Sequence, residues 1–141
     1  MIKNIIFDFD GVILDSTKIK SDAFLELYKD YSEDIQKKIY KYHNENLGID
    51  RYKKIHFFHN NFLNSKINKT ELNKLTMNFS SIVFNKIINC QFVEGAREFL
   101  EKNKENYNFF ISSGTPQNEL KKIIKLKKID KFFRNIYGSP L

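Results

Sequence analysis

Apolar residues along the chain follow two different periods, which divide it into three stretches. Residues 3–8 form a short, almost continuous apolar run, as expected for a strand buried on both faces of a parallel sheet. From Ser16 to about Asn89, apolar residues recur every three or four positions, which predicts helices. After Cys90, short apolar runs alternate again with helical spacing. This order predicts an α/β fold that is interrupted by an all-helical segment.

The helical segment has the spacing of four helices joined by short loops. Ser16 or Thr17 can act as N-cap of the first helix, and Asn68 with Glu71 resembles a capping box before the fourth. The segment lies between the first predicted strand and the next core helix. We therefore expect an inserted four-helix unit over residues 16–90 rather than a separate C-terminal domain.

Residues 91–141, together with residues 1–15, predict a discontinuous core. Two further apolar runs, residues 107–111 and 135–137, predict strands, and a helical pattern lies between them. The order strand, helix, strand, helix, strand favours a parallel sheet with right-handed crossovers. The expected fold class is α/β, a parallel Rossmann-like core of three strands that carries the inserted four-helix unit.

Polar residues gather where the first two predicted strands end. Asp8 and Asp10 follow the first strand, and Ser112 ends the second. Ligands of open α/β sheets bind beyond the carboxyl ends of the strands, so these side chains share one crevice if the strands are neighbours. Thr115 as N-cap and Pro116 as first helical residue add a helix N-terminus, which favours an anion. Because carboxylates repel an anionic ligand, a divalent cation is expected, and oxygen ligands suit Mg²⁺.

Composition narrows the partners of such a site. The 141 residues are 41% hydrophobic, which argues against disorder, and the net charge of +7 raises nucleic acid as a partner. The basic residues are nearly all lysines, with arginine only at positions 51, 97 and 134. The chain is also rich in Asn, Ile, Phe and Tyr. A/T-biased codons would produce this composition, and readers of bases and phosphates rely more on arginine, so we discount nucleic acid.

Neither a membrane span nor an internal disulfide is expected. The apolar runs are too short for a membrane helix or a signal-peptide core, and Cys90 is the single cysteine. We expect a cytoplasmic protein. The three histidines have no metal-like partner set, and we interpret them as structural.

The motif Asp8-Phe-Asp10-Gly-Val, followed by a helical insertion and then Phe110-Ile-Ser-Ser-Gly114, resembles the haloacid dehalogenase-like superfamily. More narrowly, it is similar to the phosphatase branch that carries an α-helical cap after the first strand. The resemblance covers essentially all 141 residues. It implies that the inserted helices, residues 16–90, are a cap over the active site.

The resemblance also implies roles for single residues. Asp8 would be the nucleophile that attacks phosphorus and becomes an aspartyl phosphate. Asp10 would protonate the leaving oxygen and then activate water. The Asp8 carboxylate and the Asp10 carbonyl would bind Mg²⁺. Ser112, with Ser113 and Gly11, would bind the phosphoryl group.

Two of these candidates have plain structural alternatives. Arg51 lies at the junction of the second and third predicted helices, where caps of this branch tend to reach the active site. It is a candidate substrate residue, and the alternative is an ordinary surface arginine. Ser112 could equally be a strand-end hydroxyl without a role.

The function implied is Mg²⁺-dependent hydrolysis of a phosphate monoester, with sugar phosphates as the favoured substrates. A phosphomutase is the first alternative, because Asp10 suits both reactions. The family pattern also needs a lysine near a third motif and an acidic pair after a further strand, and neither is found here. The chain thus resembles the first two-thirds of the enzyme, so impaired activity is expected. The second alternative is an inactive fragment that serves as a binding module.

Overall fold

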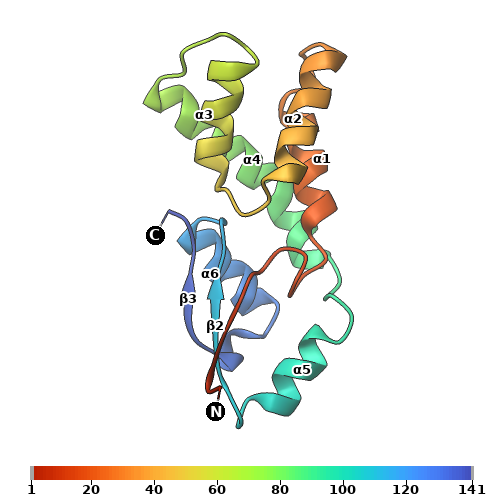
Figure 1. Cartoon of the computed structure of the whole chain (residues 1–141), viewed down its shortest axis with the longest axis vertical. Helices are drawn as coiled ribbons and strands as arrows, with labels where there is room; N and C mark the ends of the chain where they lie inside the picture. The colour runs from red at the N-terminus through yellow and green to blue at the C-terminus, as the bar shows by residue number, and fades with distance from the viewer. Residues whose placement is uncertain (1, 141) are drawn as a thin grey trace.

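The computed structural model describes residues 2–140, which form an α/β unit at one end and a helical unit at the other (Figure 1). The sheet has three strands, β1 (Asn4–Phe7), β2 (Asn108–Ser112) and β3 (Phe133–Tyr137). They pair in parallel in the order β1-β2-β3, with Asn4 opposite Asn108 and Ser112 opposite Tyr137. The expected α/β class with a parallel core and a helical insertion is confirmed.

The helices divide between the two units. The helical unit contains α1 (Thr17–Leu27), α2 (Glu33–Glu45), α3 (Arg51–Asn61) and α4 (Lys69–Asn89). The α/β unit contains α5 (Ala96–Asn103), α6 (Gln117–Leu126) and the short 3₁₀ helix η1 (Asp130–Phe132). Helix α1 packs against α2 and α4, and α4 also packs against α3 and reaches α6 in the α/β unit. Long α4 therefore connects the two units. The boundaries 16–90 stay a prediction.

Each unit has its own part of the buried core. In the helical unit, Phe24 packs against Phe79 at a centroid distance of 4.3 Å and against Phe58 at 5.5 Å. Below the sheet, Phe109 and Ile111 of β2 are fully buried. Every second residue of β2 thus faces the core. The expectation that the first strand is buried on both faces is wrong, because Ile6 of β1 is 69% exposed. The capping box at the start of α4 is confirmed, because Glu71 N donates to Asn68 Oδ1 at 2.9 Å.

Two predicted helix caps are wrong. Ser16 occupies the N-cap position of α1, but its hydroxyl makes no hydrogen bond to the helix. Helix α6 begins at Gln117 with Pro116 as N-cap residue, so Thr115 lies outside the helix and does not cap it. The hydroxyls of Ser16 and Thr115 both turn toward one carboxylate instead, as described below.

Strand β1 has a single neighbour among the strands that the structure describes. It pairs with β2 along one edge, and the side chain of Ile6 in its centre is 69% exposed. No helix within residues 2–140 is long and apolar enough to cross a membrane.

Candidate active site

Asp8 and Asp10 lie in the loop that follows β1. Phe9 between them is fully buried, and both acids line one pocket between the two units. Gly11 continues the loop with a φ of +75°, a conformation that side chains rarely adopt. A Cβ atom there would lie 2.7 Å from Thr17 Oγ1. The glycine therefore lets the chain turn tightly from the strand into the start of α1.

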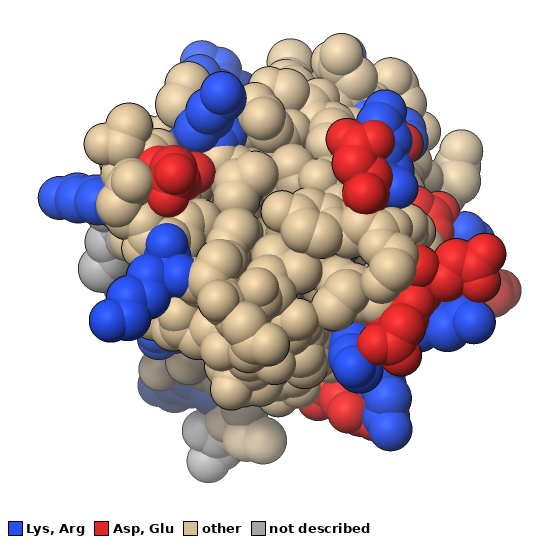
Figure 2. Space-filling model, turned by 90° about the horizontal axis from the view of Figure 1, so that it is seen from above, with Lys and Arg blue, Asp and Glu red and all other residues tan. Residues whose placement is uncertain are grey.

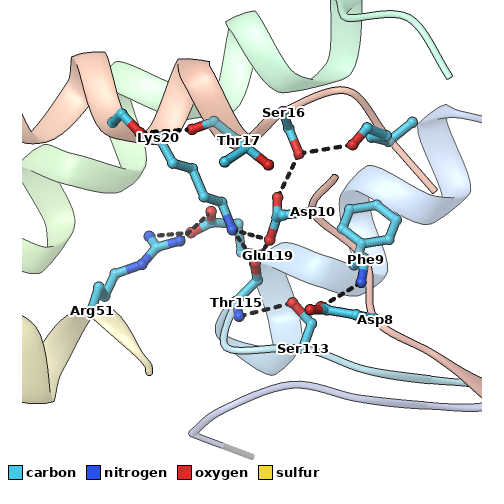
Figure 3. A network of polar contacts seen from close by, with 12 residues as sticks. Asp8, Phe9, Asp10, Ser16, Thr17, Lys20, Arg51, Ser113, Thr115 and Glu119 are labelled. Atoms are coloured by element: carbon cyan, nitrogen blue, oxygen red, sulfur yellow. Dashed lines mark hydrogen bonds and ion pairs between the residues drawn. The ribbon is translucent and has the colours of Figure 1, made fainter. Parts of the chain in front are cut away.

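The Asp10 carboxylate is held by three side chains (Figure 3). Ser16 Oγ donates to Asp10 Oδ1 at 2.6 Å, and the ammonium of Lys20 forms an ion pair with Oδ2. Lys20 Nζ also donates to Thr115 Oγ1 at 2.7 Å, and that hydroxyl lies 3.5 Å from Asp10 Oδ2. Residues from α1 and from the loop before α6 thus converge on one carboxyl group.

This environment fixes the charge of Asp10. Burial raises the pKa of the carboxyl group, but the charge of Lys20 and the hydrogen bonds from Lys20 and Ser16 outweigh it. The pKa of Asp10 therefore lies below its ordinary value. At neutral pH Asp10 is an ionised carboxylate with a fixed orientation.

Asp8 has a more open environment. It is exposed, and its Oδ1 accepts a hydrogen bond from Phe9 N at 2.6 Å. In Figure 3 the side chain of Ser113 points toward Asp8. Ser113 is nearly buried, and its Oγ accepts from Thr115 N at 3.1 Å. An exposed carboxylate oxygen next to a hydroxyl suits attack on an electrophile.

Ser112 does not join this group. Its side chain is exposed at the end of β2, and it does not line the pocket. Of the two adjacent serines, the structure thus brings Ser113 rather than Ser112 toward Asp8. The phosphate-binding roles of Ser112, Ser113 and Gly11 stay predictions.

Arg51, the candidate substrate residue, lines the pocket but is bound within the protein. Its two terminal nitrogens donate to the two carboxylate oxygens of Glu119 on α6, both at 2.8 Å (Figure 3). Ser80 Oγ on α4 donates to Glu119 at 2.7 Å and accepts from Arg51 at 2.5 Å. The Arg51 and Glu119 side chains are only 3% and 10% exposed. Arg51 is therefore no surface arginine, and its role toward a substrate stays a prediction.

The pocket is small and closed off by both units. Its volume is about 40 Å³, and it is lined by acids, cations and apolar groups: Asp8, Asp10, Thr17, Lys20, Phe24, His43, Leu47, Ile49, Arg51, Lys54, Phe79 and Gly114. A Cβ atom at Gly114 would lie 3.4 Å from the Gly48 carbonyl, so the loop after β2 touches the loop between α2 and α3. Loops from both units thus meet at the rim.

The residues present suit a magnesium ion in part. Mg²⁺ binds through one or two protein oxygens and completes its shell with water and substrate phosphate. The exposed Asp8 carboxylate and the backbone carbonyl of Asp10 could supply two oxygens. The Asp10 carboxylate is committed to Lys20, so the carbonyl is the more suitable donor. Within the described part of the chain, no cluster of three or more acidic, histidine or cysteine side chains could hold a metal by itself.

Comparison with known proteins decides the family. Residues 5–140 match the model of the haloacid dehalogenase-like hydrolases. The chain belongs to this family. Its parallel core with a helical insertion agrees with this family, as the resemblance in the sequence implied. No curated protein sequence matches the chain.

Solved structures of the haloacid dehalogenase-like family share the fold. A β-phosphoglucomutase from Clostridium difficile is 24% identical, with a TM-score of 0.76 over 96% of this chain and 61% of that one. A predicted phosphoglycolate phosphatase from Haemophilus somnus is 15% identical (TM-score 0.70, 99% and 63% coverage). The Bacillus subtilis protein YfnB, whose structure holds magnesium, is 16% identical (TM-score 0.66, 98% and 65% coverage). The chain thus spans less than two-thirds of the length of these relatives.

Sequence reasoning missed several residues of this haloacid dehalogenase-like site. Lys20 carried a usable signal, because it follows Ser16 by four positions and so lies on the same face of α1. Thr115 was assigned to a helix cap, and Glu119 lies on what looked like a plain amphipathic helix. Their roles depend on contacts between segments far apart in the sequence, which spacing alone does not reveal.

Proposed function

We propose that this protein hydrolyses the phosphate monoester of a small metabolite through an aspartyl-phosphate intermediate. The observation that carries the proposal is the pair formed by an exposed Asp8 and a fixed, ionised Asp10 in one pocket between the two units. Membership of the haloacid dehalogenase-like hydrolases supports the reaction class. The sugar phosphates favoured from the sequence remain one substrate group among several.

The two acids divide the reaction into two steps. A carboxylate oxygen of Asp8 attacks phosphorus, the bond to the ester oxygen breaks, and that oxygen takes a proton from Asp10. In the second step Asp10 accepts a proton from water, whose oxygen attacks phosphorus. The bond between phosphorus and Asp8 then breaks, which releases phosphate and restores the carboxylate.

The contacts of Asp10 favour the second step. Lys20 and Ser16 stabilise its ionised form, which is the form that accepts a proton from water. In the first step Asp10 must carry a proton, so its ion pair with Lys20 has to weaken while the ester is bound. Lys20 is thus a positioning residue that influences when Asp10 acts as acid and when as base.

Asp8 and the Asp10 carbonyl would hold the magnesium ion that the family implies. When bound, Mg²⁺ neutralises negative charge between the carboxylate and the phosphoryl group. Ser113 would donate a hydrogen bond to a phosphoryl oxygen. We expect no nucleic-acid partner, and Figure 2 supports this, because basic and acidic side chains alternate around the face it shows instead of forming a basic patch.

A phosphomutase has support of its own in the similarity to a β-phosphoglucomutase. A binding module without turnover stays the second alternative from the sequence. In a phosphomutase the aspartyl phosphate would pass its phosphoryl group to a second hydroxyl instead of water.

Release of phosphate from a panel of small monoesters with Mg²⁺ tests the proposal. The Asp8→Asn variant should lose activity by roughly three orders of magnitude or more, because it cannot form the covalent intermediate. Asp15→Asn is the matched control, since Asp15 is exposed and does not line the pocket. Mass spectrometry of acid-quenched protein should find a phosphoryl group on Asp8.

The outcomes separate the three functions. Equal turnover by wild type and Asp8→Asn would refute Asp8 as nucleophile. Transfer of the phosphoryl group between two positions of a sugar phosphate, without release of phosphate, would identify a phosphomutase. Binding of esters with neither turnover nor a phosphorylated Asp8 would identify a binding module.

A further inference from the structure

The charges that line the pocket are not balanced evenly. Of its three cationic side chains, Lys20 is paired with Asp10, and Arg51 is paired with Glu119. Lys54 on α3 has no carboxylate within 4.0 Å among the residues that the structure describes. The carboxylates of Asp10 and Glu119 neutralise Lys20 and Arg51. Lys54 is therefore the cation in the pocket that a ligand can still neutralise.

Lys54 is deeply buried and only partly hydrogen-bonded. It is 2% exposed, its Nζ lies 2.9 Å from His43 Nδ1, and the ring of Phe24 lies 6.0 Å away. Burial, followed by the charge of Lys20, lowers the pKa of Lys54 to about 8, so the ammonium is still mostly protonated at neutral pH. An ammonium has three N–H donors, and His43 accepts only one of them.

His43 is the residue that holds Lys54 in place. Burial, with the charges of Lys54 and Lys20, lowers its pKa to about 3, so the ring is neutral. Because Nδ1 accepts from Lys54, the proton lies on Nε2. Nε2 is buried and has no hydrogen-bond partner within residues 2–140. A buried donor without an acceptor costs free energy, as does a buried charge without a counter-charge.

We propose that Lys54, held in place by His43, binds an anionic oxygen group, either a carboxylate or a second phosphate, on the alcohol part of the substrate. The inference rests on the proposed function, because Asp8 and Asp10 at the other side of the pocket would take the phosphoryl group. Leu47, Ile49 and Phe79 line the same pocket and would pack against the carbon atoms between the two anionic groups.

The size of the pocket restricts the alcohol part. One ordered water needs about 10–15 Å³ of such volume, so a volume of about 40 Å³ holds about three waters. Because the phosphoryl group shares this space, the alcohol part is short, of two or three carbons, and even such an ester requires the two units to move slightly apart. The larger sugar phosphates would need a more open arrangement of the two units.

Three two-carbon esters test the site by binding alone: 2-phosphoglycolate, 1,2-ethanediol bisphosphate and 2-hydroxyethyl phosphate. The alcohol end is anionic in the first two and an uncharged hydroxyl in the third, which is called the neutral ester below. Dissociation constants are measured by calorimetry on wild type, Lys54→Met and Lys53→Met. Lys53 is the matched control, since it is the adjacent lysine but its side chain is 78% exposed. Wild type should bind one or both anionic esters about 10- to 100-fold more tightly than the neutral ester, and the preferred ester distinguishes carboxylate from phosphate.

The variants decide whether Lys54 causes the preference. Lys54→Met should bind all three esters equally, with the neutral ester unchanged within about twofold, while Lys53→Met keeps the preference. Circular dichroism and thermal unfolding check that Lys54→Met is folded, and Lys54→Gln serves as second variant if it is not. A wild type without preference, or a folded Lys54 variant that retains it, would overturn the proposal.

The nitrogen shifts of the His43 ring separate this inference from the proposed function. Glycolate, which has a carboxylate but no phosphate, should shift the resonance of His43 Nδ1, the nitrogen that contacts Lys54, in wild type and not in Lys54→Met. If that shift occurs while no phosphate ester binds or reacts, the anion site stands and the proposed function fails. If esters are hydrolysed but neither glycolate nor any anionic ester moves the His43 signal, the anion site fails and the proposed function stands.

Discussion

The Asp10 carboxylate shows how a single buried charge can determine its surroundings. A hydrogen bond to a charged group contributes about 1.5–3 kcal/mol, whereas a helix N-cap contributes about 1 kcal/mol. The hydroxyls of Ser16 and Thr115, both at positions next to helix starts, accordingly turn to Asp10 and its partner Lys20. These contacts orient the carboxylate that the proposed reaction needs as a base.

His43 is the residue whose burial has the clearest consequence for stability. Its pKa is about 3 in the folded protein and 6.5 in the unfolded chain, so between these values only the unfolded chain takes up the proton. Folded protein should therefore lose stability as the pH falls from 6.5 toward 3. In His43→Gln the free energy of unfolding, measured by urea titration, should fall less steeply, by up to about 1.4 kcal/mol per pH unit.

A second histidine provides the control for this prediction. His56 lies on α3 but is exposed, so His56→Gln should leave the pH dependence of wild type unchanged. Identical slopes for wild type and His43→Gln between pH 6.5 and 4 would show that His43 is protonated in the folded state. The neutral ring that the further inference needs would then be absent.

Single residues of the site were predictable where one segment contains the whole signal. Asp8 and Asp10 directly follow a short apolar run, and the sequence alone placed them at the end of β1. Ser113 was predicted less clearly than Ser112, because an apolar run does not show at which residue a strand ends. The partners of Asp10 and Arg51, namely Thr115 and Glu119, lie far away in the sequence and have no local signal.

Among the elements, β1 is an edge strand with an exposed apolar side chain at its centre. It pairs with β2 on one side only within the described residues, and Ile6 is 69% exposed. An apolar edge strand presents unpaired backbone groups to other molecules, which favours association. Ile6→Lys should therefore reduce self-association at high protein concentration in sedimentation velocity.

A residue on a helix controls for exposure of an apolar side chain as such. Met77 on α4 is 70% exposed, and Met77→Lys should leave the association of wild type unchanged, because a helix offers no free strand edge. Equal loss of association in both variants would attribute it to apolar surface in general. A wild type that sediments as a monomer at every concentration would contradict the prediction altogether.

The elements themselves were largely predictable from periodicity. The strands, the four inserted helices and the capping box of α4 follow from local patterns, since each needs only apolar spacing or one short motif. The start of α6 was shifted by one residue, because a proline suits both an N-cap and a first-turn position. The distance between the units was not predictable, since it depends on packing between α4, α6 and the loops.

For the whole molecule, the question is how a substrate reaches a pocket of about 40 Å³. The helical unit and the α/β unit are held together around it by Arg51, Ser80 and Glu119, and by the contact of Gly114 with the loop before α3. Any ester larger than a few atoms can enter only when these contacts open. The ion pair of Arg51 with Glu119 is one polar restraint on that opening, and the ion pair of Lys20 on α1 with Asp10 is another.

Removing one partner of the pair of Arg51 with Glu119 should open the molecule. In Glu119→Gln the guanidinium of Arg51 stays buried without its counter-charge, and such a loss costs about 3–5 kcal/mol for a buried pair. Separation of the two units exposes Arg51 to water and relieves this cost. Small-angle X-ray scattering should therefore give a larger radius of gyration for Glu119→Gln than for wild type, and hydrogen exchange should accelerate around Ser80.

The exposed pair of Arg97 and Glu101 on α5 provides the matched comparison. Its atoms lie 3.1 Å apart, but the side chains are 39% and 50% exposed, and exposed pairs contribute little to stability. Glu101→Gln should therefore leave both the radius of gyration and the exchange rates unchanged. If Glu119→Gln behaves in the same way, packing between α4 and α6 rather than the ion pair holds the units together. Entry of substrate would then require those helices to separate.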